Sequence, residues 1–403
     1  MSLNIMSSNS VPEVHLVAGT RPEAIKIAPV ALELAAAGRM RPVVVATGQH
    51  PTMVHQALAA FGIEADVTLR LDRHDGGQAE LYAQLLPQLD ALWARRPPAA
   101  VVVQGDTSST VAGACAAFWR RVPVVHLEAG LRSHDLDSPF PEEANRRLVG
   151  TLSRLHLAPT GRAADNLRRE GVELERVLVT GNTVVDAVRM IARRREPFSQ
   201  RELDAVEARA LSGNRRLLLV TVHRRESWGE PMAAVLRSVR AIVREHDDVE
   251  VVLPAHPNPS VSAQVWQALG NYPRVTVTEP LDYPDLARLL TACTLVLSDS
   301  GGIQEEAPSF GVPVLVLREV TERQEAVDAG CAQLVGTDET RILSTARRLL
   351  ADPATRTRMT ASGNPFGDGL ASARAEHALA ALIGLTESVP ERFEPFDRHV
   401  RTA

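Results

Sequence analysis

Short runs of aliphatic and β-branched residues recur along the whole chain, and helical patterns separate them. In the first half these runs predict strands at Val14–Ala18, Pro42–Ala46, Ala99–Gln104, Val122–Leu127, Leu155–Ala158 and Arg176–Thr180. In the second half they predict strands at Arg216–Val222, Val249–Pro254, Val275–Thr278, Leu295–Ser298, Val312–Leu317 and Gln333–Val335. Apolar runs without polar alternation are typical of parallel strands that are covered on both faces. With intervening helical segments such as Glu23–Ala37, Ser109–Arg120 and Arg323–Ala329, they predict right-handed βαβ units.

This alternation predicts an α/β protein with two Rossmann-like domains and mostly parallel sheets. The length of 403 residues agrees, since single cores stop growing near about 250–300 residues. The charged stretch Asp186–Arg215 has no strand pattern and predicts the junction. The expected parts are a disordered tail over 1–12, domains over 13–185 and 186–370, and a C-terminal segment over 371–403 that begins with an amphipathic helix, Ala371–Ile383.

Composition excludes several classes of function. The net charge of −5 gives no basic field that would favour nucleic acid or an anionic membrane. The polar N-terminus does not resemble a signal peptide, and no apolar run is long enough to span a membrane, so a cytoplasmic location is expected. The three cysteines lack metal-ligand spacing, which predicts neither a disulfide framework nor a metal site. Neither half contains GxGxxG, which argues against a nicotinamide or flavin cofactor.

The chain contains 43 arginines and one lysine, Lys26. A bias toward arginine has replaced lysine wherever any positive charge was sufficient. A position that stays lysine is therefore a candidate for chemistry that needs a compact point charge, because arginine is longer and planar. The alternative is the chance survival of one codon on a helix face.

Ligands of open α/β sheets bind beyond the carboxyl ends of the strands. The segment Ser300-Gly301-Gly302 turns a predicted strand into a helix, where glycines let the backbone approach a ligand and amide groups favour an anion. This pattern predicts a diphosphate cradle, with Glu306 suited to ribose hydroxyls. An ordinary turn would explain the same pattern.

A second strand-to-helix turn, Gly19–Glu23, places Arg21 at a helix start, with Pro22 at the first helical position. Lys26 follows about one turn later on a nearby face. Both cations can then face one anion. Arg21 could instead be an ordinary surface residue.

Three carboxylates from different segments are candidates for acid–base chemistry. Asp106 and Glu128 directly follow predicted buried strands, and Glu142 follows a proline-rich loop that enters a helix. Acidic groups that converge in a cleft raise one another's pKa and provide acid–base pairs. The alternatives are helix capping by Asp106 and a salt bridge from Glu142 or Glu143 to the arginines that follow.

A histidine, His223, follows the first predicted strand of the second half, before Arg224, Arg225 and Ser227. Its neighbours favour a ligand contact, as a phosphate donor or general acid, over a structural role. His256 lies at another strand end and is a weaker candidate for the same region.

Taken together, these motifs resemble the non-hydrolysing UDP-N-acetylglucosamine 2-epimerases over about residues 14–385. The resemblance rests on segments that occur in family order: Gly19–Pro29, Gly105–Thr110, His126–Arg132, Ser138–Arg146, Thr180–Asp186, Thr221–Ser227, Asp299–Ser309, Thr321–Ala329 and Asn364–Gly369. It implies the GT-B fold, with two Rossmann-like domains facing a nucleotide-sugar cleft and a C-terminal helix that packs back on the first domain. It also implies a homodimer that needs no metal or other cofactor.

The resemblance implies a reaction as well. UDP leaves C1 as the C2 proton is removed, an enzyme-bound 2-acetamidoglucal forms, and UDP adds back with the opposite configuration at C2. The catalytic residues implied are Asp106, Glu128, Glu142 and His223. The substrate-binding residues implied are Arg21, Lys26, Ser300, Gly301, Gly302, Glu306 and Arg323.

The chain departs from the family pattern at two places. Gln324 follows Arg323 where the family usually has proline, and Pro51 and Thr52 replace polar residues in a region that helps several members bind an activating second substrate molecule. Three rival functions share parts of the pattern. They are a hydrolysing 2-epimerase that releases free N-acetylmannosamine, a GT-B glycosyltransferase and a non-catalytic sensor of nucleotide sugars.

Overall fold

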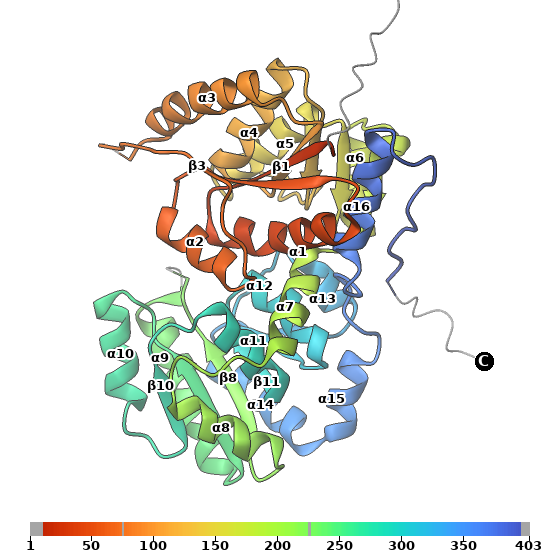
Figure 1. Cartoon of the computed structure of the whole chain (residues 1–403). Coiled ribbons are helices and arrows are strands. Elements are labelled where there is room, and N and C mark those ends of the chain that lie inside the picture. Colours follow the sequence, from red (N-terminus) through yellow and green to blue (C-terminus); the bar gives the residue numbers. More distant parts are fainter. Residues whose placement is uncertain (1–10, 75, 225–226, 396–403) are drawn as a thin grey trace, which may run out of the picture. The chain divides into compact units, whose positions relative to one another are not determined.

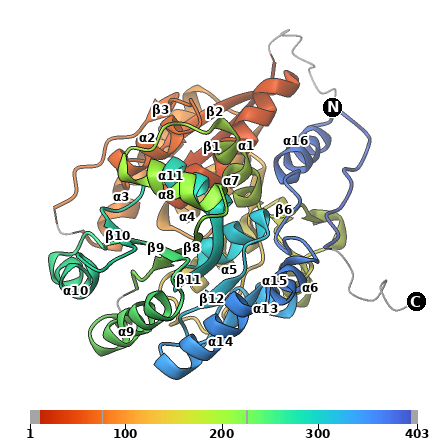
Figure 2. The ribbon, with the colours of Figure 1, turned by 90° about the horizontal axis from the view of Figure 1, so that it is seen from below.

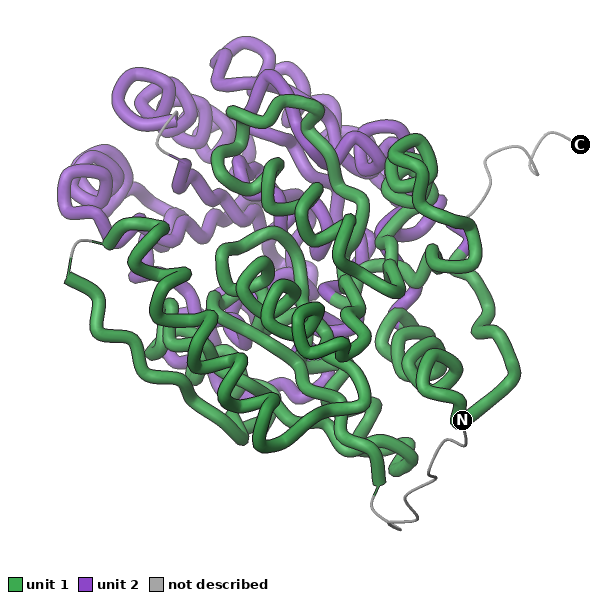
Figure 3. The backbone as a smooth tube through the Cα atoms, turned by 90° about the horizontal axis from the view of Figure 1, so that it is seen from above, with its two compact units in different colours: residues 1–183, 370–393 green, residues 184–369, 394–403 purple. Residues whose placement is uncertain are grey.

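The computed structural model of the chain describes residues 11–74, 76–224 and 227–395. Most of the expected tail over 1–12 lies outside the described residues, as does Arg225. The chain divides into two compact units (Figure 3): unit 1 comprises residues 1–183 and 370–393, and unit 2 comprises residues 184–369 and 394–403.

Unit 1 is built on a parallel sheet with the strand order β3-β2-β1-β4-β5-β6-β7. Its strands are β1 (Glu13–Ala18), β2 (Arg41–Ala46), β3 (Val67–Thr68), β4 (Ala100–Gln104), β5 (Val124–Leu127), β6 (Leu155–Ala158) and β7 (Val177–Val179). The order reverses between β1 and β4, so the chain crosses from one half of the sheet to the other there. Ligands of doubly wound folds bind at such a point.

Helices cover this sheet (Figure 1). They are α1 (Arg21–Ala37), α2 (Pro51–Ala59), α3 (Gln78–Arg95), α4 (Ser108–Trp119), α5 (Glu142–Leu152), α6 (Gly161–Arg169) and α16 (Ala371–Leu382), with a 3-10 turn η1 at Leu174–Arg176. One core cluster joins α3 and α4 to the strands through Leu85, Leu89, Trp93 and Val103. These side chains are fully buried or nearly so, which provides much of the unit's hydrophobic stabilisation.

The helix α16 belongs to unit 1 although it lies near the end of the chain, and it packs against α1. Arg39 at the end of α1 makes two hydrogen bonds with Glu376 of α16, at 2.6 Å from Nε and 2.5 Å from Nη2. The segment after α16 also returns to the sheet, where the Phe393 amide donates to the Val179 carbonyl at 2.8 Å.

Unit 2 has a second parallel sheet with the order β10-β9-β8-β11-β12-β13. Its strands are β8 (Arg216–Thr221), β9 (Val249–Pro254), β10 (Val275–Thr278), β11 (Cys293–Ser298), β12 (Val314–Val316) and β13 (Ala332–Leu334). The reversal lies between β8 and β11, the counterpart of β1 and β4.

The unit 2 sheet is also covered by helices (Figure 2). They are α7 (Thr183–Arg194), whose first residue lies in unit 1, α8 (Glu202–Leu211), α9 (Glu230–Glu245), α10 (Pro259–Leu269), α11 (Tyr283–Ala292), α12 (Gly301–Glu306), α13 (Gln324–Asp328), α14 (Glu339–Ala351) and α15 (Pro353–Thr360), with a 3-10 turn η3 at Ala307–Phe310. Leu218 and Val220 of β8 face a core cluster that includes residues of α9, α10 and α14. Leu217 and Leu219 are also buried and point to the opposite face, because side chains alternate along a strand.

The α/β fold class with parallel sheets is confirmed, and every predicted run overlaps a strand. The prediction of six strands in the first half was wrong by one, because β3 is only two residues long and has no apolar run to announce it. The position of Pro22 was also wrong by one, since α1 begins at Arg21.

Candidate active site

The turn after β1 packs closely against the turn after β4. A Cβ atom on Gly19 would lie 2.0 Å from the Ser109 Oγ and 2.6 Å from the Thr47 Oγ1, so only glycine fits there. This close approach brings the start of α1 beside the start of α4.

Glu23 ties these two helix starts together, a role that the sequence reasoning missed. Its carboxylate accepts hydrogen bonds from the amides of Gly19 at 3.0 Å and Thr20 at 2.6 Å. It also accepts from the hydroxyls of Thr107 at 2.6 Å and Thr110 at 3.0 Å. Burial raises the pKa of Glu23, while these donors oppose the shift. The spacing Thr20-x-x-Glu23, a capping box, was the available signal.

Glu128 follows β5 and lies at the centre of a buried polar cluster, with only 9% of its surface exposed. Its Oε1 accepts from the Lys26 Nζ, and from the Asn182 Nδ2 at 2.8 Å. Its Oε2 accepts from the Gln104 Nε2. The backbone of Glu128 has a φ of 64°, in the left-handed region that residues other than glycine rarely adopt. Such strain is concentrated at functional sites.

The lone lysine is therefore a partner of a predicted catalytic carboxylate. Lys26 is 8% exposed and lies on α1, one turn after Arg21. A buried charge is tolerated only when it is paired and hydrogen-bonded. The predicted contact of Lys26 with a diphosphate stays a prediction beside this observed contact with Glu128.

Asp106 follows β4 and pairs with Arg146 of α5. The Arg146 Nε donates to the Asp106 Oδ2 at 2.8 Å, and the Nη2 lies 2.7 Å from the same oxygen. The Asn145 Nδ2 donates to the Asp106 carbonyl at 2.8 Å. Helix capping by Asp106, the structural alternative, is wrong, because Thr107 is the N-cap of α4.

The two neighbouring glutamates at the start of α5 have different surroundings. Glu143 is fully buried and contacts Arg146 at 3.2 Å and Arg147 at 3.4 Å. Although burial opposes ionisation, the Ser133 amide and the Arg146 guanidinium lower the pKa of Glu143. Glu142 is half-buried, and its carboxylate has no ion pair or hydrogen bond among the residues that the structure describes.

In unit 2, His223 follows β8 and pairs with Asp299, which follows β11. The His223 Nδ1 lies 2.8 Å from the Asp299 Oδ1. Asp299 is fully buried and also accepts from the amides of His223 and Arg224 and from the Ser227 hydroxyl, at 3.0 to 3.2 Å. Burial opposes ionisation, but His223 lowers the pKa of Asp299 below its usual value. This carboxylate orients the imidazole and was not assigned a role from the sequence.

The glycine pair after β11 lies beside Arg323. A Cβ atom on Gly301 would lie 3.3 Å from the Arg323 Cζ, and the Arg323 Nε donates to Glu305 at 2.9 Å. Glu306 ends α12 and is buried. The Asn364 Nδ2 donates to the Glu305 carbonyl at 2.7 Å, which ties the Asn364–Gly369 motif to this helix.

His256, the weaker histidine candidate, lies after β9 with its ring edge-on to Trp228, 5.5 Å between centroids. Burial and the nearby His223 lower the pKa of His256. Its Nδ1 accepts from the Asn258 amide at 3.0 Å, so a neutral ring carries its proton on Nε2.

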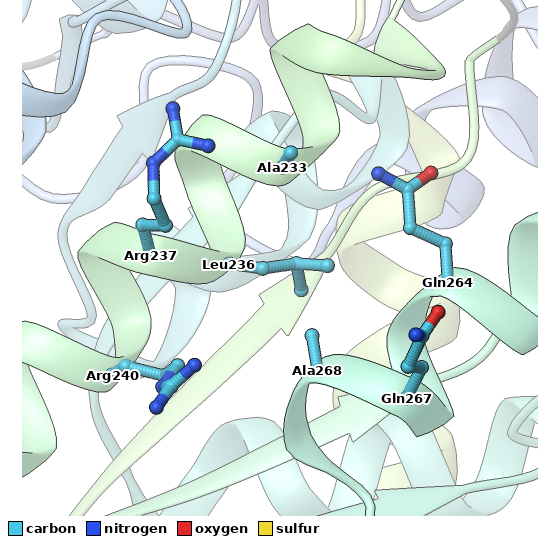
Figure 4. Close-up of a pocket in the computed structure, with 7 residues that line it drawn as sticks. All are labelled: Ala233, Leu236, Arg237, Arg240, Gln264, Gln267 and Ala268. Carbon is cyan, nitrogen blue, oxygen red and sulfur yellow. The ribbon is translucent and has the colours of Figure 1, made fainter.

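A surface pocket between α9 and α10 contains arginines and glutamines above an apolar floor (Figure 4). Arg237 already contacts Glu230 at 2.9 Å and Glu339 at 3.0 Å. Arg240 lies over the ring of Tyr272, 5.2 Å from its centroid. Since both guanidinium groups have partners within the chain, this pocket lacks the free charge of an anion site.

Over the described part of the chain, no group of three or more His, Cys, Asp or Glu side chains has an arrangement that could hold a metal ion. The same residues form no helix long and apolar enough to cross a membrane.

The family model of UDP-N-acetylglucosamine 2-epimerase matches residues 32–380. The chain is 43% identical to the UDP-N-acetylglucosamine 2-epimerase of Bacillus subtilis, over 94% of this chain and 98% of that protein. It is 44% identical to the protein of the same name from Salmonella typhimurium, over 91% and 98% of the two chains.

Solved structures agree with these relatives. A putative UDP-N-acetylglucosamine 2-epimerase from Listeria monocytogenes has a TM-score of 0.88 and 37% identity, over 96% of this chain and 100% of that chain. The UDP-GlcNAc 2-epimerase from Neisseria meningitidis, solved bound to UDP-GlcNAc, has a TM-score of 0.81 and 39% identity, over 91% and 99%. The fold is of the GT-B type, and the chain belongs to the UDP-N-acetylglucosamine 2-epimerase family.

Two buried histidines, His126 and His156, predict that the folded protein loses stability in acid. Burial lowers the pKa of His126 to about 4 and, with the nearby His126, that of His156 to about 3, from a usual value of 6.5. Unfolding below pH 6.5 therefore takes up protons, so stability is complete above pH 6.5 and falls as the pH drops toward 4. Each histidine contributes about 1.4 kcal/mol per pH unit in that window.

Thermal melting at pH 7.5 and pH 5.5 tests this expectation. The His156→Leu variant should lose less stability on acidification than the wild type, because it lacks a buried imidazole that takes up a proton on unfolding. Neither ring nitrogen of His156 has a partner among the described residues, so the substitution removes no hydrogen bond. His74→Leu, at a side chain that is 80% exposed, is the matched control and should keep the wild-type slope. Equal slopes for wild type and His156→Leu would contradict the account.

Proposed function

We propose that this chain catalyses the reversible epimerisation of UDP-N-acetylglucosamine at C2, giving UDP-N-acetylmannosamine without net hydrolysis. The observation that carries the proposal is the buried cluster in which Lys26, Gln104 and Asn182 donate to Glu128 after β5. Asp106, which follows the adjacent strand β4, accepts a hydrogen bond from Arg146. The names of the relatives support the substrate.

The chemistry explains why such groups are needed. The proton on a sugar C2 is barely acidic, and breaking the C1–O bond toward an oxocarbenium-like state makes it removable. The C1–O electron pair leaves with UDP, the C2 proton passes to a carboxylate, and a C1–C2 double bond forms. Return of a proton to the other face of C2 and of UDP to C1 gives the epimer. Both directions need bases near C2 and donors that stabilise the departing diphosphate.

Asp106, Glu128 and Glu142 are the proposed catalytic carboxylates. Glu128 and Asp106 each lie against a cation of the chain, Lys26 and Arg146, which fixes the position of each carboxylate. Glu142 has no such cation among the described residues, so no contact within the chain fixes its carboxylate. His223, oriented by Asp299, is the proposed donor to the leaving phosphate.

The remaining residues are proposed to bind the nucleotide. Arg323 lies beside Gly301, where a guanidinium and backbone amides suit a diphosphate. The full proposed set is Arg21, Lys26, Ser300, Gly301, Gly302, Glu306 and Arg323. The proposal includes no metal ion or organic cofactor.

Incubation with UDP-N-acetylglucosamine in D2O, followed by NMR of the sugar, tests the reaction. The expected product is UDP-N-acetylmannosamine that carries deuterium at C2, with deuterium also entering the substrate pool. Accumulation of free N-acetylmannosamine and UDP would instead identify a hydrolysing epimerase. Absence of exchange at C2 would contradict both.

Lys26→Arg tests whether the site needs a lysine. The variant keeps the charge, but a guanidinium is longer and planar and would displace Glu128 in a buried site. We expect kcat to fall about 100-fold, as for a catalytic group displaced by about 1 Å. Arg41→Lys, at a side chain that is 60% exposed, is the control and should keep normal turnover. Near-normal kcat in Lys26→Arg would mean that the lysine survived by chance.

We further propose that the chain forms a homodimer through α4 and α5, which pack against each other. Phe118 and Trp119 on α4 and Leu148 on α5 are 52%, 63% and 54% exposed, and large exposed apolar side chains are typical of interfaces.

Light scattering of the purified protein tests this dimer. Trp119→Glu should convert the dimer to monomer, whereas Trp266→Glu, at the exposed tryptophan of α10, should leave it unchanged. A monomeric wild type, or a Trp119→Glu variant that stays dimeric, would contradict the proposal.

A further inference from the structure

Two adjacent arginines on α5 differ in what they contact. Arg146 is 9% exposed and lies between Asp106 and Glu143. The side chain of Arg147 is 43% exposed and contacts Glu143 alone among the described carboxylates. The sequence places both in the same helix turn, so only the structure separates a residue that acts on Asp106 from one that does not.

The contact of Arg146 with Asp106 is asymmetric. Both Nε at 2.8 Å and Nη2 at 2.7 Å lie close to Oδ2, and Oδ1 accepts no hydrogen bond from the guanidinium. Asn145 holds the Asp106 carbonyl from the same helix at 2.8 Å. The Asp106 side chain is 25% exposed while that of Arg146 is 10% exposed, so the carboxylate is the more accessible partner of the pair.

Glu143 in turn fixes Arg146. Its Oε2 accepts from the Arg146 Nη1 at 3.2 Å and from the Ser133 amide at 2.9 Å, and its Oε1 accepts from the His134 amide at 3.3 Å. A fully buried carboxylate with these partners has little freedom to move. The arginine therefore has one orientation, set by a backbone loop that is far from Asp106 in the sequence.

We propose that Arg146 is a positioning residue for the epimerisation, held by Glu143 and holding the Asp106 carboxylate so that Oδ1 faces the substrate. This inference rests on the proposed function, in which Asp106 is a catalytic carboxylate. Arg146 acts through Asp106 and does not itself touch the reacting atoms. Glu142, the neighbour of Glu143, has no part in this chain of contacts.

Steady-state kinetics of Arg146→Ala and Arg147→Ala, with the C2 deuterium exchange as readout, test the inference. Arg146→Ala should lower kcat about 100-fold, the lower end of what a positioned acid–base group contributes, with little change in KM. Arg147→Ala should stay within about threefold of the wild type, because exposed ion pairs contribute little. Equal effects of the two substitutions would overturn the inference.

A double substitution separates positioning from a general structural role. If Arg146 acts only through Asp106, the variant with both Asp106→Asn and Arg146→Ala should be no slower than Asp106→Asn alone. Multiplication of the two single effects would contradict the inference. Wild-type protein without any exchange at C2 would instead show that the proposed function fails, which is a different result.

A lysine variant remains informative if Arg146→Ala does not fold, and a rescue experiment adds a second test if it does. Arg146→Lys keeps the buried charge but not the two-nitrogen contact, so it should fold and lose about tenfold in kcat. Guanidinium at a non-denaturing concentration should partly restore kcat in a folded Arg146→Ala and leave Arg147→Ala unchanged. Full activity of Arg146→Lys, or no rescue of a folded Arg146→Ala, would overturn the inference.

Discussion

The buried carboxylate of Glu128 is the constraint on which the rest of unit 1 depends. Three segments that are distant in the sequence supply its donors, since Lys26 is on α1, Gln104 ends β4 and Asn182 precedes α7. Its backbone is left-handed, a strained conformation that the surrounding structure must maintain. Removing one partner of a buried ion pair such as Lys26–Glu128 typically lowers the free energy of unfolding by about 3–5 kcal/mol. The pair therefore also contributes to the stability of the unit.

Five of the described carboxylates differ in how many backbone amides and hydroxyl groups donate to them in the contacts given above. Glu23, Glu143 and Asp299 are buried and accept several backbone or hydroxyl hydrogen bonds, so they hold other groups in place. Asp106 and Glu128 face cations and keep a defined orientation. In the proposed mechanism, the positioning and the acid–base work thus fall to different side chains, which is how a pre-organised site limits the reorganisation needed during reaction.

The sequence predicted the parallel sheets, because buried strands have continuous apolar runs, and it predicted the segments of the candidate site, because the carboxyl ends of those strands carry polar residues. It did not predict β3, which has two residues, or the separate roles of Glu142 and Glu143, which are adjacent in the chain. The pairs Lys26–Glu128 and His223–Asp299 join residues far apart in sequence. Local pattern carries no information on such contacts.

The central claim is that Lys26 and two amide side chains hold Glu128 as an ionised carboxylate in the resting protein. Infrared difference spectroscopy between the wild type and Glu128→Gln, with isotope-labelled glutamate, measures this directly. The account predicts a carboxylate band for Glu128 between pH 6 and pH 8, and a changed band in Lys26→Arg. A protonated carbonyl band for Glu128 in the wild type would contradict it.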